Sequence, residues 1–368
     1  MKRICIVTTT RADYGYLKWL MQEIKDDSAL GLQVVVTGAH LITNQGYTVD
    51  QIISDGIPIA EKVYVLVDNS SPEGICYSMA QYAKSFSYTF SHLKPDILVV
   101  LGDRYELLPI CSTAFMMGIP IAHIAGGDIT EGALDDGVRN AITMLATYHF
   151  PTNPDSAKNI TRMKGSDSNV FITGSPSLDS FNNVDLMSRE QLAENLSLDQ
   201  NKDWILCTFH PETKKSIDYN ISTIKNLIEV LESLNNCQVV ITKANLDLGG
   251  AEINEFIQQV AIRNPIKFKF IYSLGQLKYL SFMKQTKLII GNSSSGITEA
   301  PFLGIPVVNI GNRQKGRYFC KNIIQSGCEK EDIQVAISKV LNGKYMIKSS
   351  YWGDGNATSK IIKILREI

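Results

Sequence analysis

Residues 96–106 read DILVVLGDRYE, and this stretch decides the fold. An uninterrupted apolar run at 97–101 is followed at once by glycine and then by charged residues. A short apolar run of this kind is typical of a strand buried on both faces of a parallel sheet. In open parallel sheets, ligands bind beyond the carboxyl ends of the strands. The charged residues after the run are therefore candidates for a functional site.

The same alternation of apolar runs and amphipathic stretches continues in both directions along the chain. In the first half we predict strands at 3–9, 32–37, 63–67, 96–101, 119–123 and 170–173, with helices at 16–27, 74–93, 105–117 and 137–147. In the second half we predict strands at 204–209, 238–242, 268–271, 287–291 and 306–310, with helices at 188–196, 219–234, 250–263, 274–284, 295–303 and 330–341. This rhythm predicts an α/β protein with two Rossmann-like, doubly wound parallel-sheet domains.

The run Gly-Ser-Pro-Ser at 174–177 is the best candidate for a domain boundary. We expect an N-terminal domain at 1–175 and a C-terminal domain at 176–354. The last segment, 355–368, carries its isoleucines on one helical stripe, so we expect a helix that packs back on the N-terminal domain.

Composition excludes several classes of function. The 368 residues carry a formal net charge of -1, which gives no general attraction to nucleic acid or to an anionic membrane. No stretch approaches the ~20 apolar residues of a membrane helix, and the N-terminus has no signal peptide, so we expect a cytoplasmic protein. The seven cysteines are scattered without a CxxC pair, which favours reduced thiols. The turn after the first strand has no GxGxxG, and the histidines lack partners at metal-ligand spacing, so we expect neither a cofactor nor a catalytic metal.

Charged residues follow three strands of the first half. Arg11 and Asp13 follow the first strand, and an arginine there suits phosphate. Asp103 and Arg104 follow strand 96–101, where a carboxylate can act as a base or bind sugar hydroxyls, or simply cap a helix. A glycine-rich loop with acidic and basic groups follows strand 119–123; its candidates are Asp128, Glu131, Asp135, Asp136 and Arg139. Asp135 and Asp136 also fit the first turn of a helix, where one of them would serve only as a cap.

The second half carries its candidates in the same places. His210 ends the strand at 204–209, where it could transfer a proton or hold a phosphate oxygen. The turn GNSSSG at 291–296 exposes backbone N–H groups and hydroxyls at a helix N-terminus, as an anion site does, although serine caps are also common. The candidates there and beyond are Asn292, Ser293, Ser294, Gly296, Glu299 and Arg313.

Taken together, these stretches resemble the UDP-N-acetylglucosamine 2-epimerase family, in particular its hydrolysing branch. The motifs that carry the resemblance are TRADYG (10–15), VTGAH (36–40), LGDRYE (101–106), AGGDITEGALDD (125–136), GSPSLD (174–179), FHPET (209–213), GNSSSG (291–296) and GNRQKGR (311–317). The resemblance implies a fold like that of the two-Rossmann-domain (GT-B) glycosyltransferases, with the active site in the interdomain cleft and UDP held mainly by the C-terminal domain. It also implies a homodimer and a UDP-sugar as substrate.

The resemblance further implies roles for individual residues. Asp103 and Asp135 would be catalytic carboxylates, with Asp128 or Glu131 as further acid–base groups, and His210 would assist the departure of UDP. Ser293 and Ser294 would bind phosphate, and Glu299 would bind the ribose. The diphosphate would be contacted by Arg11 and Arg313. The remaining expected substrate-binding residues are Asp13, His40, Arg104, Asp136, Arg139, Asn292 and Gly296.

The reaction implied is elimination of UDP across carbons 1 and 2 to a glycal, followed by addition of water, giving N-acetylmannosamine and UDP for sialic-type acids. Two positions depart from the family pattern. Ala125 stands where many members carry a glutamate, and Thr298 where an arginine is common. Ala125 favours an acetamido or methyl group, so UDP-2,4-diacetamido-2,4,6-trideoxyglucose is the competing substrate. The motifs are also compatible with a non-hydrolysing epimerase, with a glycosyltransferase of the same architecture and with a nucleotide-sugar sensor without turnover.

Overall fold

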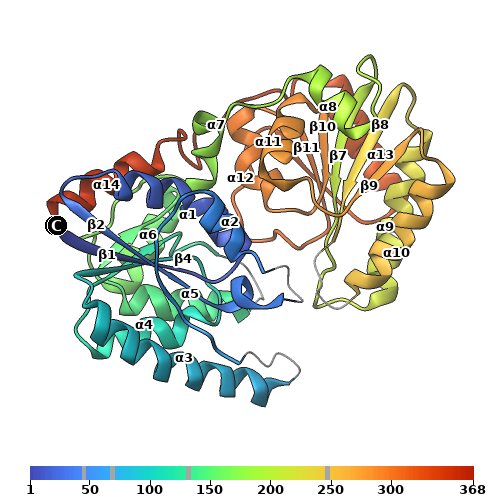
Figure 1. The fold of residues 1–368 in the computed structure, drawn as a ribbon. Coiled ribbons are helices and arrows are strands. Elements are labelled where there is room, and N and C mark those ends of the chain that lie inside the picture. Colours follow the sequence, from blue (N-terminus) through green and yellow to red (C-terminus); the bar gives the residue numbers. More distant parts are fainter. Residues whose placement is uncertain (44–46, 67–70, 130–133, 245–248) are drawn as a thin grey trace. The chain divides into compact units, whose positions relative to one another are not determined.

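The computed structural model describes residues 1–43, 47–66, 71–129, 134–244 and 249–368. The chain divides into two compact units, Met1–Asn182 with Tyr351–Ile368, and Asn183–Ser350. Each unit contains one six-stranded sheet, and every pair of neighbouring strands is parallel. The predicted α/β fold with two doubly wound sheets is confirmed (Figure 1).

The first unit has the strand order β3-β2-β1-β4-β5-β6. Its strands are β1 (Lys2–Thr8), β2 (Leu30–Val36), β3 (Ile59–Lys62), β4 (Ile97–Leu101), β5 (Ile121–Ile124) and β6 (Tyr148–Phe150). Its helices are α1 (Arg11–Lys25), α2 (Val49–Ser54), α3 (Pro72–Leu93), α4 (Leu107–Met116), α5 (Leu134–Leu145), α6 (Pro154–Lys164) and α14 (Ala357–Glu367), with short 3-10 turns at Gly38–Leu41 and Pro176–Leu178.

Strand β1 is apolar from Ile4 to Val7, where its side chains are buried on both faces of the sheet. Ile4 and Ile6 pack on one face of the sheet, in a cluster with residues of α1 and α14. Cys5 and Val7 alternate with them and pack on the other face, against α3 and α4. Both faces are covered, so neither set of side chains can be polar. In Figure 1, α14 runs alongside α1, and its residue Ile361 is fully buried in the shared cluster.

The second unit has the order β12-β11-β10-β7-β8-β9. Its strands are β7 (Asp203–Thr208), β8 (Cys237–Thr242), β9 (Phe268–Ile271), β10 (Leu288–Gly291), β11 (Val307–Ile310) and β12 (Ile323–Ser326). Its helices are α8 (Arg189–Leu196), α9 (Ile217–Ser233), α10 (Gly250–Arg263), α11 (Gly275–Gln285), α12 (Ser295–Leu303) and α13 (Lys330–Asn342), and the short α7 (Ser180–Asn183) spans the point where the chain passes from the first unit to the second. Helices α9, α10 and α13 cover one face, and Trp204 stacks on Phe282 of α11 on the other.

Both sheets reverse the direction of strand order at one place, and this place positions the candidate residues. In the first unit the reversal lies between β1 and β4, and in the second between β7 and β10. At such a point the two adjacent loops diverge and leave a crevice at the carboxyl edge of the sheet, where ligands bind. The loops in question begin at Thr9 and Gly102, and at Phe209 and Asn292.

Two of the predicted strands are wrong, and two strands of the structure were not predicted. The strand predicted at 63–67 forms earlier, as β3. Residues 170–173 form no strand; Val170 makes a single bridge to His149, and Phe171 packs on Phe150 with ring centroids 6.1 Å apart. The edge strand of the sheet is instead β6, which the sequence did not predict. Strand β12 was also missed. Among the helices of the described ranges, none is both long and apolar enough to cross a bilayer.

Candidate active site

The turn after β1 is organised by the carboxylate of Asp13. Asp13 accepts hydrogen bonds from the hydroxyls of Thr8 (2.6 Å) and Thr9 (2.7 Å), and from the backbone N–H groups of Thr9 and Thr10 (both 3.0 Å). Thr10 in turn caps α1, so the two residues form a capping box. The carboxylate of Asp13, which is predicted to bind the ligand, thus accepts hydrogen bonds from the residues of its own turn. The same turn places the exposed Arg11 at the first position of α1.

His40 completes this arrangement from the loop after β2. Its Nε2 lies 3.0 Å from the Thr8 hydroxyl and 3.8 Å from Asp13 Oδ1, and its Nδ1 lies 2.8 Å from the Thr48 hydroxyl. Burial acts to raise the pKa of Asp13, but the hydrogen bonds from His40, Thr8 and Thr9 outweigh burial and lower it. Asp13 therefore remains ionised in the fold, and His40 is buried beside it.

The loop after β4 places two residues of opposite charge side by side. Arg104 and Glu106 form an ion pair at 2.8 Å, and Glu106 is buried while Arg104 is exposed. Burial acts to lower the pKa of Arg104, but the charge of Glu106 and then of Asp13 raises it. Asp13 thus lies near enough to Arg104 to act on it, although the two residues follow different strands.

Arg139 gathers the acidic residues of the first unit. Its guanidinium forms ion pairs with Asp103 and with Asp136, the latter at 2.8 Å, and donates to the backbone carbonyl of Asp128 at 2.7 Å. Arg139 is buried, whereas both carboxylates are partly exposed. The residue predicted to bind substrate is therefore engaged by three protein groups, and it orients the carboxylates. Asp135, which precedes Asp136 in the first turn of α5, is exposed.

Asp128 is fixed from the side of α6. Its Oδ1 accepts from the Thr152 hydroxyl (3.3 Å), from Asn153 Nδ2 (3.2 Å) and from the Ser156 hydroxyl. The backbone before it can approach α6 only because residue 127 is glycine: φ is +78°, and a Cβ would lie 2.3 Å from the Ser156 carbonyl oxygen. The predicted acid–base residue Glu131 lies outside the described residues.

His123 connects the loop after β4 with α5. Its Nε2 lies 2.8 Å from the Gly102 carbonyl oxygen and its Nδ1 lies 3.2 Å from the Thr143 hydroxyl. Burial lowers the pKa of His123 to about 4, so the ring is neutral near pH 7. It holds the backbone next to Asp103 in place.

In the second unit, Asn292 locks the loop that carries His210. Asn292 is fully buried; its Oδ1 accepts from the His210 backbone N–H at 2.7 Å, and its Nδ2 donates to the His210 carbonyl at 2.8 Å. The Asn292 carbonyl accepts from Arg313 (3.2 Å) and from the Gln314 amide (2.8 Å). The side chain of Asn292 thus holds the protein backbone, and its own carbonyl joins a third loop; that Asn292 binds substrate stays a prediction.

His210 and Arg313 lie together at this carboxyl edge. Burial, and then the charge of Arg313, lower the pKa of His210 to about 3. An imidazole of this pKa is neutral near pH 7, so it can donate one N–H hydrogen bond but carries no charge.

The serine loop after β10 forms the start of α12. The Ser295 hydroxyl lies 3.0 Å from that of Ser293 and 2.5 Å from that of the half-buried Tyr279. Ser294 is the exposed N-cap residue, and Glu299 is buried one turn further along. Gly296 lets the helix pack closely on β11, because a Cβ there would lie 3.1 Å from Val307.

Sequence reasoning missed four residues that shape these loops. They are Thr143, Glu212, Tyr279 and Gln314. Glu212 and Gln314 lie inside quoted motifs, which was the available signal. Thr143 and Tyr279 lie on helices, where nothing in the pattern distinguished them from packing residues. Among the described residues, no three histidine, cysteine or carboxylate side chains gather as metal ligands do.

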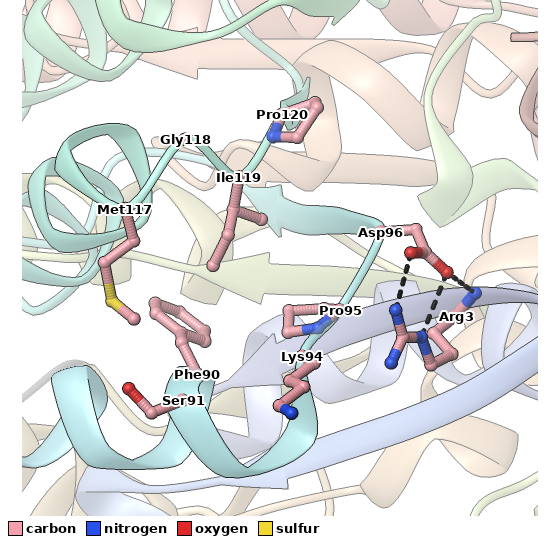
Figure 2. A pocket seen from close by; sticks show the side chains of 10 residues that line it. All are labelled: Arg3, Phe90, Ser91, Lys94, Pro95, Asp96, Met117, Gly118, Ile119 and Pro120. Atoms are coloured by element: carbon pink, nitrogen blue, oxygen red, sulfur yellow. Dashed lines mark hydrogen bonds and ion pairs between the residues drawn. The ribbon is translucent and has the colours of Figure 1, made fainter.

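A hollow of about 530 Å³ in the first unit lies elsewhere (Figure 2). Its lining includes Phe90, Met117 and Ile119, and the Arg3–Asp96 ion pair closes one side, at 2.8 Å. These residues belong to the amino edge of the sheet, where β1, β4 and β5 begin. The candidate residues all follow the carboxyl ends of strands, so this hollow is separate from them.

Comparison with known proteins extends over nearly the whole chain. The model of the family described as UDP-N-acetylglucosamine 2-epimerase matches residues 22–366. The chain is 39% identical to the GDP/UDP-N,N'-diacetylbacillosamine 2-epimerase (hydrolyzing) of Campylobacter jejuni, covering 92% of this chain and 87% of that protein. It is 29% identical to the UDP-N,N'-diacetylbacillosamine 2-epimerase (hydrolyzing) of Legionella pneumophila, over 100% and 96% of the two chains. The fold matches the UDP-GlcNAc 2-epimerase of Neisseria meningitidis bound to UDP-GlcNAc, with a TM-score of 0.85, 19% identity and full coverage of both chains.

Proposed function

The chain belongs to the UDP-N-acetylglucosamine 2-epimerase family, and from this premise we propose that it is a hydrolysing 2-epimerase of a UDP-sugar, with UDP-2,4-diacetamido-2,4,6-trideoxyglucose as preferred substrate. The observation that carries the proposal is the 39% identity to a relative named as hydrolysing and as acting on diacetylbacillosamine. UDP-N-acetylglucosamine, which the sequence motifs favour, is the competing substrate.

The loops of the second unit supply the groups for binding and release of UDP. The N-terminus of α12, with Ser293 and Ser294, offers N–H groups and hydroxyls to phosphate oxygens. Arg313 neutralises the charge that grows on the departing diphosphate, which is the largest contribution we expect. His210 is neutral, so we assign it a hydrogen bond to a phosphate oxygen and not the delivery of a proton.

The carboxylates of the first unit perform the acid–base steps. One of them takes the proton from carbon 2 as the bond from carbon 1 to UDP breaks, which leaves the glycal and free UDP. Water then adds its oxygen to carbon 1. A solvent proton adds to carbon 2 from the face opposite to the one that lost its proton, which gives the 2-epimer. We assign these steps to Asp103, which Arg139 orients, and to the exposed Asp135. Asp128 has its Oδ1 occupied by three donors, so we assign it to shaping the loop.

Ala125 supports the choice of sugar. It has a φ of +61°, a left-handed conformation unusual for a residue other than glycine, and it directly follows β5, beside the glycines of the acidic loop. Its single methyl group packs against the apolar cluster of the first unit that contains Ile124 and Phe150. A small apolar residue at this turn suits the acetamido and methyl substituents of the deoxy sugar better than hydroxyls.

The test is an NMR time course in deuterated water with each of the two UDP-sugars and with a GDP-linked diacetamido sugar, since the Campylobacter relative is named for both nucleotides. We expect free UDP and a free 2-epimer with deuterium at carbon 2, formed fastest from the UDP-linked diacetamido sugar. A product that stays nucleotide-linked would exclude hydrolysis. Faster turnover of UDP-N-acetylglucosamine would refute the choice of sugar. UDP bound tightly without turnover or deuterium exchange would indicate a sensor.

A further inference from the structure

Glu212, two residues after His210, joins the loop after β7 to the loop after β11. Its Oε1 accepts a hydrogen bond from the backbone N–H of Asn312 at 2.7 Å, and only 8% of the residue is exposed. The backbone of Glu212 is itself fixed, because its N–H donates to Asn220 Oδ1 at 2.8 Å and its carbonyl accepts from the same amide at 3.3 Å. The carboxylate is therefore an immobile anchor for Asn312.

The glycine before Asn312 is shaped to receive this carboxylate. Gly311 has a φ of +73°, and a Cβ on it would lie 2.1 Å from Glu212 Oε1. Two independent features of the backbone thus require glycine, the left-handed conformation and the close approach of the carboxylate. The contact with Glu212 is built into the turn.

The turn that Glu212 holds leads directly to Arg313. Arg313 and Gln314 both donate to the Asn292 carbonyl, at 3.2 and 2.8 Å. The segment is therefore tied at one end to the loop of His210, through Glu212, and further along to the loop of Ser293, through Asn292. Gly311 is also held by the neighbouring strand, because its N–H donates to the Ser326 carbonyl at 3.1 Å and its carbonyl accepts from Gln325 Nε2 at 2.6 Å. Glu212 is the group that accepts the N–H of Asn312, the residue directly before Arg313.

We propose that Glu212 is a positioning residue, which sets the geometry of Arg313 for binding the diphosphate of UDP. The inference rests on the proposed function, because it presumes that Arg313 binds UDP. Glu212 itself does not contact the ligand; its effect passes through the backbone of Asn312. A charge-assisted hydrogen bond is stronger than a neutral one, which favours a carboxylate at this anchor.

The test measures UDP affinity by titration calorimetry on the full chain. We expect Glu212→Ala to weaken UDP binding by about tenfold or more, in line with the loss of one hydrogen bond to a charged group. Glu212→Gln keeps an oxygen that can accept from Asn312, so we expect its affinity to be within about threefold of the wild type. We expect Glu212→Ala combined with Arg313→Ala to bind UDP no more weakly than Arg313→Ala alone, since residues that act through one another are not additive.

Asp27→Ala is the matched control. Asp27 is 9% exposed and accepts the backbone N–H groups of Ala29 at 2.7 Å and Leu30 at 3.3 Å, and it also pairs with Arg366, but it belongs to the first unit, at the amino edge of its sheet. We expect Asp27→Ala to lower the melting temperature at least as much as Glu212→Ala does, with UDP affinity unchanged.

Three outcomes overturn the inference. Glu212→Ala could bind UDP as the wild type does; Glu212→Gln could bind as weakly as the alanine variant; or the effects of Glu212→Ala and Arg313→Ala could multiply, which would show that Glu212 acts independently. A wild-type chain that does not bind UDP overturns the proposed function and, with it, this inference. If the wild-type chain binds UDP and one of these three outcomes is found, only the inference about Glu212 is overturned, and the proposed function is not affected.

Discussion

Replacing Asn292 by alanine separates the role of this residue in folding from its role at the diphosphate loops. The side chain is fully buried and makes two hydrogen bonds to the His210 backbone, at 2.7 and 2.8 Å. Alanine removes the amide oxygen and nitrogen that make these bonds, and it leaves the buried N–H and carbonyl of His210 unsatisfied. Each such group costs about 1–3 kcal/mol, so we expect the free energy of unfolding to fall by roughly 2–5 kcal/mol.

The same change should release the loop that carries His210. Without the amide, His210 is no longer held against the loop that begins with Ser293, and we expect UDP affinity to fall by about tenfold or more, a loss of about 1.4 kcal/mol or greater. The assays are urea unfolding followed by circular dichroism, and calorimetric titration with UDP well below the unfolding transition.

Gln238→Ala is the matched control. Gln238 accepts from the Asp199 backbone N–H at 2.7 Å and donates to the Ile266 carbonyl at 2.8 Å, so it makes the same pair of bonds. It lies near the amino end of β8, at the edge of the sheet away from the candidate residues. These bonds are only partly buried, so we expect a smaller loss of stability, about 1–2 kcal/mol, with UDP affinity within about twofold of the wild type. Unchanged stability in Asn292→Ala would refute the reasoning about buried partners. Unchanged UDP affinity would show that the fixed His210 backbone plays no part in binding the diphosphate.

Three further predictions follow from the first unit. Arg139→Lys should lower kcat for UDP release by about a hundredfold while leaving UDP affinity nearly unchanged, since a lysine cannot orient two carboxylates and a carbonyl at once; equal kcat would contradict its orienting role. Gly127→Ala should destabilise the chain by more than about 2 kcal/mol in urea unfolding, because its Cβ would meet the Ser156 carbonyl at 2.3 Å; a stable variant would mean that the loop can move away from α6. Burial lowers the pKa of His123 to about 4 from an ordinary 6.5, so the unfolded chain takes up the proton first as pH falls. The contribution of the neutral ring to the free energy of unfolding is therefore complete above pH 6.5 and is lost towards pH 4, by up to about 1.4 kcal/mol per pH unit. His123→Asn should flatten the dependence by that amount, and an unchanged slope in unfolding experiments at stepped pH would argue against a buried neutral ring.

The alternation of strands and helices was predictable because both faces of each sheet are covered, which makes the strands continuously apolar. Pairing was less predictable. Residues 170–173 are as apolar and β-branched as a strand, yet Phe171 packs on Phe150 and the run joins the sheet by one bridge only. Strand β6 is short and contains His149, so its pattern is weak. An apolar run indicates burial, and it does not indicate which backbone groups it pairs with.

The candidate residues were predictable as a set because they follow strands. Their division of labour was not. Asn292 is predicted to bind the substrate, and the structure shows that its amide holds the backbone of His210, which lies 82 positions away in the sequence. Asp13 is predicted to bind the ligand, and the structure adds a second role, because its oxygens accept hydrogen bonds from the threonines of its own turn. Only the folded geometry shows which polar groups are already occupied by other parts of the protein.

The first unit is assembled from both ends of the chain, and this affects how the protein emerges from the ribosome. Ile361 and Leu365 are fully buried members of the cluster under α1, and Asp179 accepts the backbone N–H groups at the start of α14. Residues Asn183–Ser350 are synthesised in between and form a unit of their own. The unit Asn183–Ser350 can therefore become native during translation, whereas residues Met1–Asn182 leave the apolar cluster under α1 incomplete until residues 357–367 have been synthesised.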